Sequence, residues 1–247
     1  MNRYYYDLHI QSCLSPCGDN DNTPANIAGM ASLKGLQILA LTDHNTCGNC
    51  PAFFKACKAF GIIPVPGMEL TTAEDIHLVC LFPSLETAMD FDALVRTHRV
   101  LIPNRPAIFG DQLLMDENDR VIGQEEHLLI NATDLSLEQA VPLVRQAGGV
   151  VYPAHIDREA NGIIAVLGTF PEQPAFSCVE YYDKTKRPGL EERFPILRGK
   201  PSVVSSDAHY LGHINEAENA FMLEDEPYSG DLVRRNLLAL LAQGERL

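Results

Sequence analysis

The sequence predicts an α/β protein, and two observations support this fold class. Short apolar runs typical of strands alternate with helical segments along most of the 247 residues. Several of these runs are almost continuously apolar, as expected of strands that are buried on both faces of a sheet. The strand–helix–strand repetition favours a parallel sheet or barrel. The predicted strands are residues 4–10, 37–41, 62–65, 77–82, 150–153, 178–182, 202–205 and 220–223.

Start and stop signals define the helices between these strands. Thr23 followed by Pro24 is typical of a helix start, and Gly35 is typical of its end. Ser136 and Gln139 have the spacing of a capping box at the start of another helix. Further helices are predicted at residues 86–99 and 231–242.

The stretch 85–134 interrupts the alternation and is far longer than a usual connection. It contains the predicted helix 86–99 and a possible hairpin whose turn is residues 116–119. We expect residues 1–84 and 135–247 to form the main barrel domain. We expect residues 85–134 to be an insertion that caps the face carrying the active site.

The charge balance narrows the candidate partners. With 19 basic and 33 acidic side chains, the formal net charge is −14. Such a surface repels polyanions at long range, so extended nucleic acid is an unlikely partner. The same acidity could include carboxylates that hold metal ions. No apolar run approaches the ~20 residues that cross a bilayer, and no secretory signal is evident. We therefore expect a cytoplasmic protein with no membrane contact.

Acidic and histidine side chains recur at the ends of the predicted strands. In parallel α/β folds these strand ends form the face that binds ligands. A single strand-end histidine is more often a structural residue, but six segments of this kind together predict a metal site. Imidazoles and carboxylates are the ligands that borderline-hard divalent ions require. These side chains are Asp7, His9, Asp43, His44, Glu69, His77, His155, Asp207 and His209.

Five of these segments follow one another in a specific order: Asp7-Leu-His9-Ile-Gln11-Ser, Leu41-Thr-Asp43-His44-Asn45, Gly67-Met-Glu69-Leu, Pro-Ala-His155 and Ser-Ser-Asp207-Ala-His209. Together they resemble the motifs of the polymerase and histidinol phosphatase (PHP) family, from residue 4 to about residue 210. The resemblance implies a distorted (β/α)7 barrel with a phosphoesterase site that holds two or three divalent ions, with Mn, Zn or Fe as the candidates.

The resemblance also implies which residues hold each ion. His9, Gln11, Glu69 and Asp207 would hold the first, and Glu69 would bridge to a second held by His77 and His155. A third would lie between His44, His209 and an acidic residue after the first motif, for which we choose Asp19 over Asp21. Glu69, Asp207 and His209 would be catalytic, with Asp207 or His209 handling the departing proton.

Position 11 departs from the family pattern, which expects a histidine where this chain has Gln11. A glutamine oxygen binds zinc-like ions more weakly than imidazole does. The first ion would then bind less tightly, or it would be a harder ion such as manganese. An inactive site is the alternative interpretation. Asp7 and Asp43 adjoin ligands, and we interpret both as orienting imidazoles, with backbone capping as the alternative.

Basic side chains near the site would bind the phosphate. Arg158, Lys184, Lys186 and Arg187 are the candidates, and a solvated basic loop is the alternative reading of the last three. Four cysteines could form a thiolate metal site or a redox pair, although cytosolic cysteines are usually small buried apolar residues. These cysteines are Cys13, Cys17, Cys47 and Cys50.

We therefore expect a metal-dependent phosphoesterase whose substrate is a small phosphate ester, such as a nucleotide or a phosphorylated metabolite. A nuclease that cuts oligonucleotide ends is the first alternative, and it would need a continuous basic track. A non-phosphate hydrolase of the amidohydrolase type is disfavoured by the Asp43-His44 and Gly-Met-Glu69 segments. A metal-binding regulatory module without catalysis has Gln11 as its support.

Overall fold

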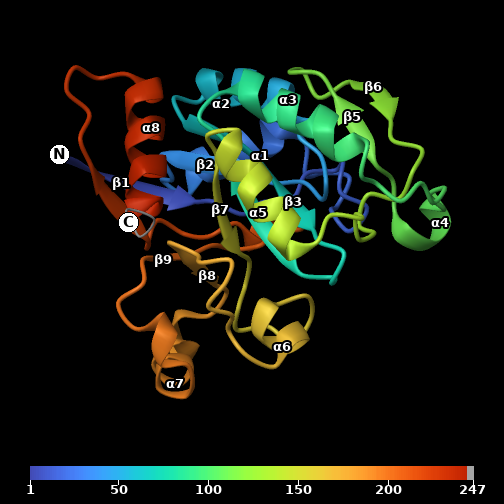
Figure 1. Cartoon of the computed structure of the whole chain (residues 1–247). Helices are drawn as coiled ribbons and strands as arrows, with labels where there is room; N and C mark the ends of the chain where they lie inside the picture. Colours follow the sequence, from blue (N-terminus) through green and yellow to red (C-terminus); the bar gives the residue numbers. More distant parts are fainter. Residues whose placement is uncertain (244–247) are drawn as a thin grey trace.

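The computed structural model describes residues 1–243, in which a curled, mixed six-stranded sheet separates helices on its two faces (Figure 1). The strand order is β10–β1–β2–β3–β4–β7. A parallel pair, β8–β9, and an antiparallel hairpin, β5–β6, complete the strands. Their bounds are β1 Asn2–Asp7, β2 Ile38–Leu41, β3 Ile63–Thr71, β4 His77–Leu81, β5 Leu113–Met115, β6 Val121–Gln124, β7 Val150–Pro153, β8 Val179–Tyr181, β9 Ser202–Val204 and β10 Ala220–Leu223.

Two helices, α1 and α5, begin where the sequence signals predict. Thr23 caps α1 by accepting a hydrogen bond from Asn26 N. Ser136 and Gln139 form both hydrogen bonds of the predicted capping box at the start of α5. The helices are α1 Pro24–Leu33, α2 Cys50–Ala59, α3 Leu85–Arg96, α4 Pro106–Phe109, α5 Leu137–Gln146, α6 Ile163–Leu167, α7 Arg187–Arg193 and α8 Gly230–Leu241, with 3-10 turns at Lys184–Lys186, Pro195–Leu197 and Leu211–His213.

The hydrophobic core lies on both faces of the sheet. Successive side chains of a strand point to opposite faces, and β2 follows this rule. Ile38 and Ala40 pack in the cluster that contains the apolar side of α8. Leu39 and Leu41 pack in the cluster formed with α1, α2, α3 and α5. In Figure 1, α8 lies well apart from α3 and α5. Its N-terminal part approaches α2, where the Arg234 guanidinium lies 5.4 Å from the centre of the Phe54 ring.

The expectation of a parallel sheet is wrong for two strands. β1, β2 and β3 are parallel, but β10 pairs antiparallel to β1, and β4 pairs antiparallel to both β3 and β7. The short turn between β3 and β4 leaves no room for the crossover that a parallel pair requires. As a result, the start of β4 lies beside the end of β3, where Thr71 pairs with His77.

The sheet curls toward β8 and β9. An isolated parallel bridge joins Ile10, after β1, to Ala208, after β9. This bridge brings the first and last strand-end segments together at one edge. A complete (β/α)7 barrel is not confirmed.

The stretch 85–134 contains α3, α4 and the expected hairpin β5–β6. Phe91 of α3 packs in the main core. Asp92 accepts hydrogen bonds from Thr46 Oγ1 and Cys47 N, each at 2.8 Å, and so ties α3 to the loop after β2. The division into a barrel domain and a capping insertion stays a prediction. Among residues 1–243, no helix has the length and apolar character needed to span a membrane.

A buried arginine provides a test of the fold. Arg234 of α8 donates hydrogen bonds to Pro83 O at 2.8 Å and Pro64 O at 3.0 Å. Arg234→Met is expected to lower the free energy of unfolding by about 2–3 kcal/mol, because two buried carbonyls lose charged donors. Urea denaturation measures the change. The matched control is Arg235→Met on the exposed side of α8, which should stay within about 0.5 kcal/mol of the parent protein. Equal effects of the two variants would contradict this account.

Candidate metal centre

The buried carboxylate of Glu69, in β3, lies at the middle of the predicted site. Its Oε1 is 2.7 Å from His77 Nδ1 and 3.1 Å from His155 Nε2. Its Oε2 is 3.2 Å from His9 Nε2 and 3.3 Å from His44 Nδ1. Burial raises the pKa of Glu69, but the surrounding imidazoles outweigh it and hold the pKa well below the ordinary value. The carboxylate is therefore ionised and faces ring nitrogens that come from four separate segments.

Several side-chain nitrogen and oxygen atoms around Glu69 lie close together without forming hydrogen bonds. His44 Nδ1, His77 Nδ1 and Asp207 Oδ1 are buried and have no hydrogen-bond partner among the described residues. Buried polar atoms without partners are uncommon in proteins and require an explanation. Imidazole nitrogens and carboxylate oxygens that converge without mutual hydrogen bonds are arranged as the ligands of a cation are. The residues present therefore fit divalent metal ions.

Three sets of side chains could each hold an ion, since their ligand atoms lie within 4.8 Å of one another. The first group is His9, Glu69 and Asp207; the second group is His44, Glu69 and His77; the third group is Cys17, His44 and His209. Glu69 is shared by the first and second groups, which is compatible with the predicted bridging role, but the second group contains His44 where the resemblance implied His155. His155 adjoins the second group through its contact with Glu69.

Backbone strain accompanies two of these side chains. His155 has φ of 29° and Asp207 has φ of 48°, which is the left-handed region that residues with a Cβ rarely adopt. Strain of this kind costs of order 1–3 kcal/mol and is concentrated at functional sites. His155 follows the end of β7 and Asp207 follows the end of β9, and at these positions each side chain turns toward the metal centre.

Glu180 of β8 orients His9, a role that sequence reasoning missed. Its Oε1 accepts a hydrogen bond from His9 Nδ1 at 2.9 Å and from His155 N at 3.0 Å. Because a carboxylate only accepts, His9 Nδ1 carries the proton and Nε2 presents its lone pair to the first group. The available signal was a lone carboxylate within the apolar run 178–182.

Asp7 and Asp43, the predicted imidazole orienters, hold loops instead. Asp7 accepts hydrogen bonds from Ser206 N and Asn215 N, both at 3.0 Å. Asp43 accepts from Ser12 N at 2.6 Å and from the Ser12 hydroxyl at 2.7 Å. Burial raises the pKa of each carboxyl to about 6, although these hydrogen bonds oppose the shift. These contacts match the alternative interpretation of Asp7 and Asp43, in which the carboxylates cap backbone N–H groups.

Gln11 turns its amide nitrogen, and not its oxygen, toward the first group. Its Nε2 donates a hydrogen bond to Glu69 Oε2 at 2.7 Å, and its Oε1 accepts one from Ser15 Oγ at 2.5 Å. In this orientation Gln11 is a hydrogen-bond donor to the Glu69 carboxylate. A role as ligand would require the amide to turn over and therefore stays a prediction.

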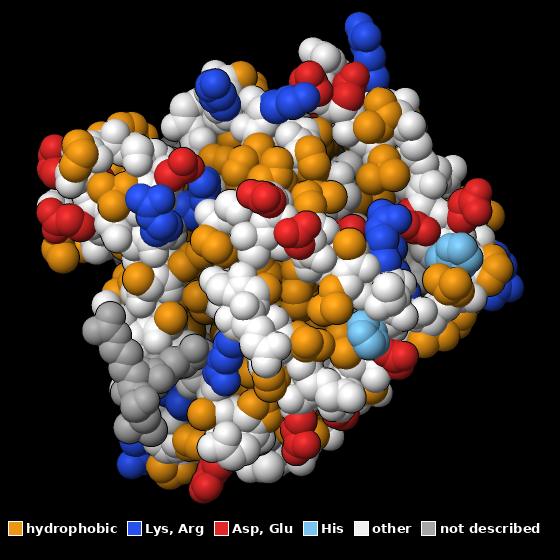
Figure 2. Space-filling model, turned by 45° about the horizontal axis from the view of Figure 1, so that its top comes forward, with side chains coloured by type: hydrophobic (Ala, Val, Ile, Leu, Met, Phe, Trp, Pro, Cys, Tyr) orange, Lys and Arg blue, Asp and Glu red, His pale blue; other side chains and the backbone are white. Residues whose placement is uncertain are grey.

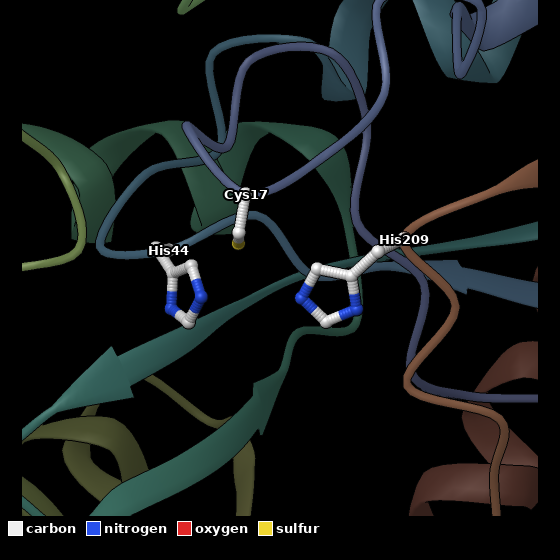
Figure 3. Close-up of side chains that lie close together, drawn as sticks. All are labelled: Cys17, His44 and His209. Atoms are coloured by element: carbon white, nitrogen blue, oxygen red, sulfur yellow. The ribbon is translucent and has the colours of Figure 1, made fainter. Parts of the chain in front are cut away.

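The structure brings Cys17, and not Asp19, to His44 and His209 (Figure 3). Asp19 Oδ1 accepts a hydrogen bond from Asp21 N at 2.9 Å, and Asp19 is in none of the three groups found among residues 1–243. Burial, together with the Glu69 and Asp207 carboxylates, raises the pKa of the Cys17 thiol. The sequence signal for this ligand was Cys17, which lies two residues before Asp19 and was not assigned to the third group.

The four-thiolate hypothesis does not fit the described residues. Cys47 and Cys50 are buried in the core, and their sulfurs lie 3.2 Å and 3.7 Å from Gly67 O. Cys13 is also buried, and its sulfur donates to Leu113 O at 3.8 Å. None of the three groups in residues 1–243 contains two cysteines.

Of the predicted basic residues, Arg158 lies at the centre. It donates a hydrogen bond to Asp207 and lines a cavity of about 140 Å³ together with Glu69 and His209. Its guanidinium lies 4.9 Å from the centre of the Tyr182 ring. The other three residues lie elsewhere: Lys184 lines an adjoining pocket, Lys186 donates to Asp157 O, and Arg187 pairs with Glu191.

A buried carboxylate ringed by imidazoles at the edge of an α/β sheet is an arrangement that fits a metal-dependent hydrolase. Residues 7–145 match the model of the PHP domain family. The match spans more than half of the chain, so the chain belongs to the PHP family, as its motifs predict.

Relatives by sequence cover parts of the chain. A 5'-3' exoribonuclease of Haemophilus influenzae is 32% identical over 112 residues, which are 44% of this chain and 39% of that protein. An uncharacterized protein of Methanocaldococcus jannaschii is 37% identical over 76 residues, which are 28% of this chain and 44% of that protein. The chain thus spans less than half the length of these relatives.

Solved structures share the fold over nearly the whole chain. The lesion-specific endonuclease PfuEndoQ of Pyrococcus furiosus has a TM-score of 0.66 at 16% identity, covering 98% of this chain and 56% of that one. An endonuclease Q complex with a 27-mer duplex carrying an abasic lesion has a TM-score of 0.58 at 16% identity, covering 95% and 56%. A protein of Bifidobacterium adolescentis, provisionally described as a metal-dependent phosphoesterase, has a TM-score of 0.58 at 20% identity, covering 94% and 95%.

These comparisons overturn the expectation about partners, which was a small phosphorylated substrate with extended nucleic acid as unlikely. Structures with this fold include an endonuclease bound to duplex DNA, and one relative is named an exoribonuclease. The inference failed because a formal charge of −14 includes the carboxylates but omits the cations that such a centre holds. The local field at the site, and not the net charge, decides which anions bind.

The orienting role of Glu180 is testable. Glu180→Gln is expected to weaken metal binding by roughly 10-fold or more, because a neutral amide polarises the His9 ring less. Competition with a chromogenic chelator measures the affinity. Glu192→Gln changes an exposed glutamate of α7 and serves as the control. The same metal affinity in both variants would show that Glu180 has no orienting role.

Proposed function

We propose that this protein is a metal-dependent phosphodiesterase that cleaves single-stranded nucleic acid at or near a chain end. The observation that carries the proposal is the shared carboxylate of Glu69, whose two oxygens face two adjacent ligand groups. Glu69, Asp207 and the histidines around them would hold the ions. Bound divalent cations supply neutralisation of phosphate charge and a water of lowered pKa.

The side chains beside these groups complete the proposed mechanism. The Arg158 guanidinium, which lines the cavity, suits binding of a non-bridging phosphate oxygen. Asp207 and His209 line the same cavity and are the candidates to pass a proton to the departing oxygen. The cavity of about 140 Å³ is smaller than the roughly 300 Å³ of pockets that enclose a drug-sized ligand. A phosphate therefore fits inside, and the rest of the substrate must lie outside.

An adjoining pocket supports a nucleotide as that remaining part. It has a volume of about 490 Å³ and is lined by Tyr182, Lys184, His213 and Ser206, among others. Ser206 directly precedes Asp207, so this pocket begins beside the metal centre. The half-exposed Tyr182 ring could stack on a base, and Lys184 could contact a backbone phosphate.

The charges on the face that Figure 2 shows are mixed. The Lys and Arg side chains of the described residues are separated there by acidic and apolar ones. The proposed substrate is therefore assigned to the metal centre and its adjoining pocket, and no basic track on this face is assigned to it.

Cleavage of end-labelled 20-mer RNA and DNA strands with added manganese or zinc tests the proposal. We expect stepwise shortening of a labelled strand. Glu69→Gln should slow it at least roughly 100-fold, since several kcal/mol of transition-state stabilisation is lost. Glu86→Gln, an exposed residue of α3, is the control. Cleavage by Glu69→Gln at the parent rate, or release of phosphate from monoesters alone, would refute the proposal.

The stacking role of Tyr182 gives a separate prediction. Tyr182→Ala is expected to raise KM for a single-stranded oligonucleotide roughly 5- to 100-fold, and Tyr182→Phe should leave it near the parent value. Steady-state kinetics measure both. Tyr228→Ala, at an exposed tyrosine lining a different pocket, is the control. A KM that depends equally on Tyr182 and Tyr228 would contradict the assigned pocket.

A further inference from the structure

We propose that Cys17, His44 and His209 form a zinc-preferring site whose thiolate stands where the family pattern expects a carboxylate. This inference deepens the metal-dependent function proposed above and rests on it. The three side chains come from the loop after β1, the loop after β2 and the segment after β9. Figure 3 shows the Cys17 sulfur directed toward the gap between the two imidazole rings.

The tautomer of His209 is fixed by its neighbour. His209 Nδ1 lies 2.7 Å from the carbonyl oxygen of Asp207. A carbonyl only accepts, so Nδ1 carries the proton and Nε2 keeps a free lone pair. In Figure 3 the other ring nitrogen, Nε2, is the one that faces His44. His209 is thus set to bind a cation in the third group.

His44 presents a different ring nitrogen to each of two groups. Its Nδ1 lies 3.3 Å from Glu69 Oε2, on the side of the second group, and has no hydrogen-bond partner among the described residues. Its other ring nitrogen, Nε2, faces His209 and Cys17 (Figure 3). Nε2 is therefore the His44 atom available to a cation in the third group, where Cys17 and His209 complete the set.

The loop that carries Cys17 is built to hold it there. Asp19 N donates to His209 O at 2.9 Å, and Gly18 N donates to Ser15 O at 2.9 Å. A Cβ at Gly18 would lie 2.3 Å from Ser12 O, so this tight turn requires glycine. Cys17 is also distinct from the other six cysteines, which are all buried, because it is half-buried and lines the cavity of the centre.

The donor types favour different ions at the two ends of the centre. Thiolate and imidazole select zinc over manganese, and three protein ligands with an open fourth position are typical of a catalytic zinc. The first group, with the carboxylates of Glu69 and Asp207 and a single imidazole, suits a harder ion such as manganese. We therefore expect zinc at the third group and manganese at the first.

Cobalt substitution tests the thiolate directly. The purified full-length protein is stripped with a chelator and titrated with Co²⁺. The parent protein should show a near-ultraviolet thiolate-to-cobalt charge-transfer band that Cys17→Ser lacks. Cys13→Ser, which removes a thiol outside the three groups, should keep the band. A band that persists in Cys17→Ser, or that is absent from the parent protein, would overturn the inference.

Metal selectivity gives the second readout. Cys17→Asp restores a carboxylate and should weaken zinc binding at least roughly 10-fold while manganese binding is retained. Unchanged zinc affinity in a variant with native circular dichroism would also overturn the inference. Neither measurement depends on hydrolysis. A normal cobalt band without oligonucleotide cleavage would refute the nuclease proposal alone, and cleavage without the band would refute the thiolate site alone.

Discussion

The arrangement of the whole site depends on one buried negative charge. Glu69 is 1% exposed, and four imidazole nitrogens approach its two oxygens to within 3.3 Å. A buried carboxylate is costly unless opposite charge or donors surround it. The strands that deliver these imidazoles must therefore end at the same edge of the sheet. The antiparallel turn from β3 into β4 meets this requirement, because it places His77 beside the end of β3.

Much of this arrangement could be predicted from local sequence. Helix starts at Thr23 and Ser136 depend on hydrogen bonds within three residues, so they can be read from the chain alone. The strand ends that carry His9, Glu69 and Asp207 were found because burial of strands leaves polar residues at their ends. The family motifs then supplied the expected ligand sets, and the structure brings these three side chains together.

What could not be predicted depends on contacts between distant segments. The direction of β4 is set by pairing with β3 and β7, and apolar content does not encode it. Glu180 contacts His9 from 171 positions away, and the choice of Cys17 over Asp19 depends on how one loop bonds to His209. The partners were misjudged because net charge averages over the surface, whereas a phosphate responds to the local field of a site.

The centre as a whole combines a hard, carboxylate-rich end with a softer, thiol-containing end around one shared carboxylate. Arg158 and Tyr182 extend it toward a pocket of nucleoside size. Anomalous diffraction from crystals of the metal-loaded protein, recorded at the zinc and manganese absorption edges, tests the central claim most directly. This account predicts anomalous peaks on both sides of the Glu69 carboxylate, each within coordination distance of an imidazole. Solvent alone between Glu69 and its histidines would contradict it.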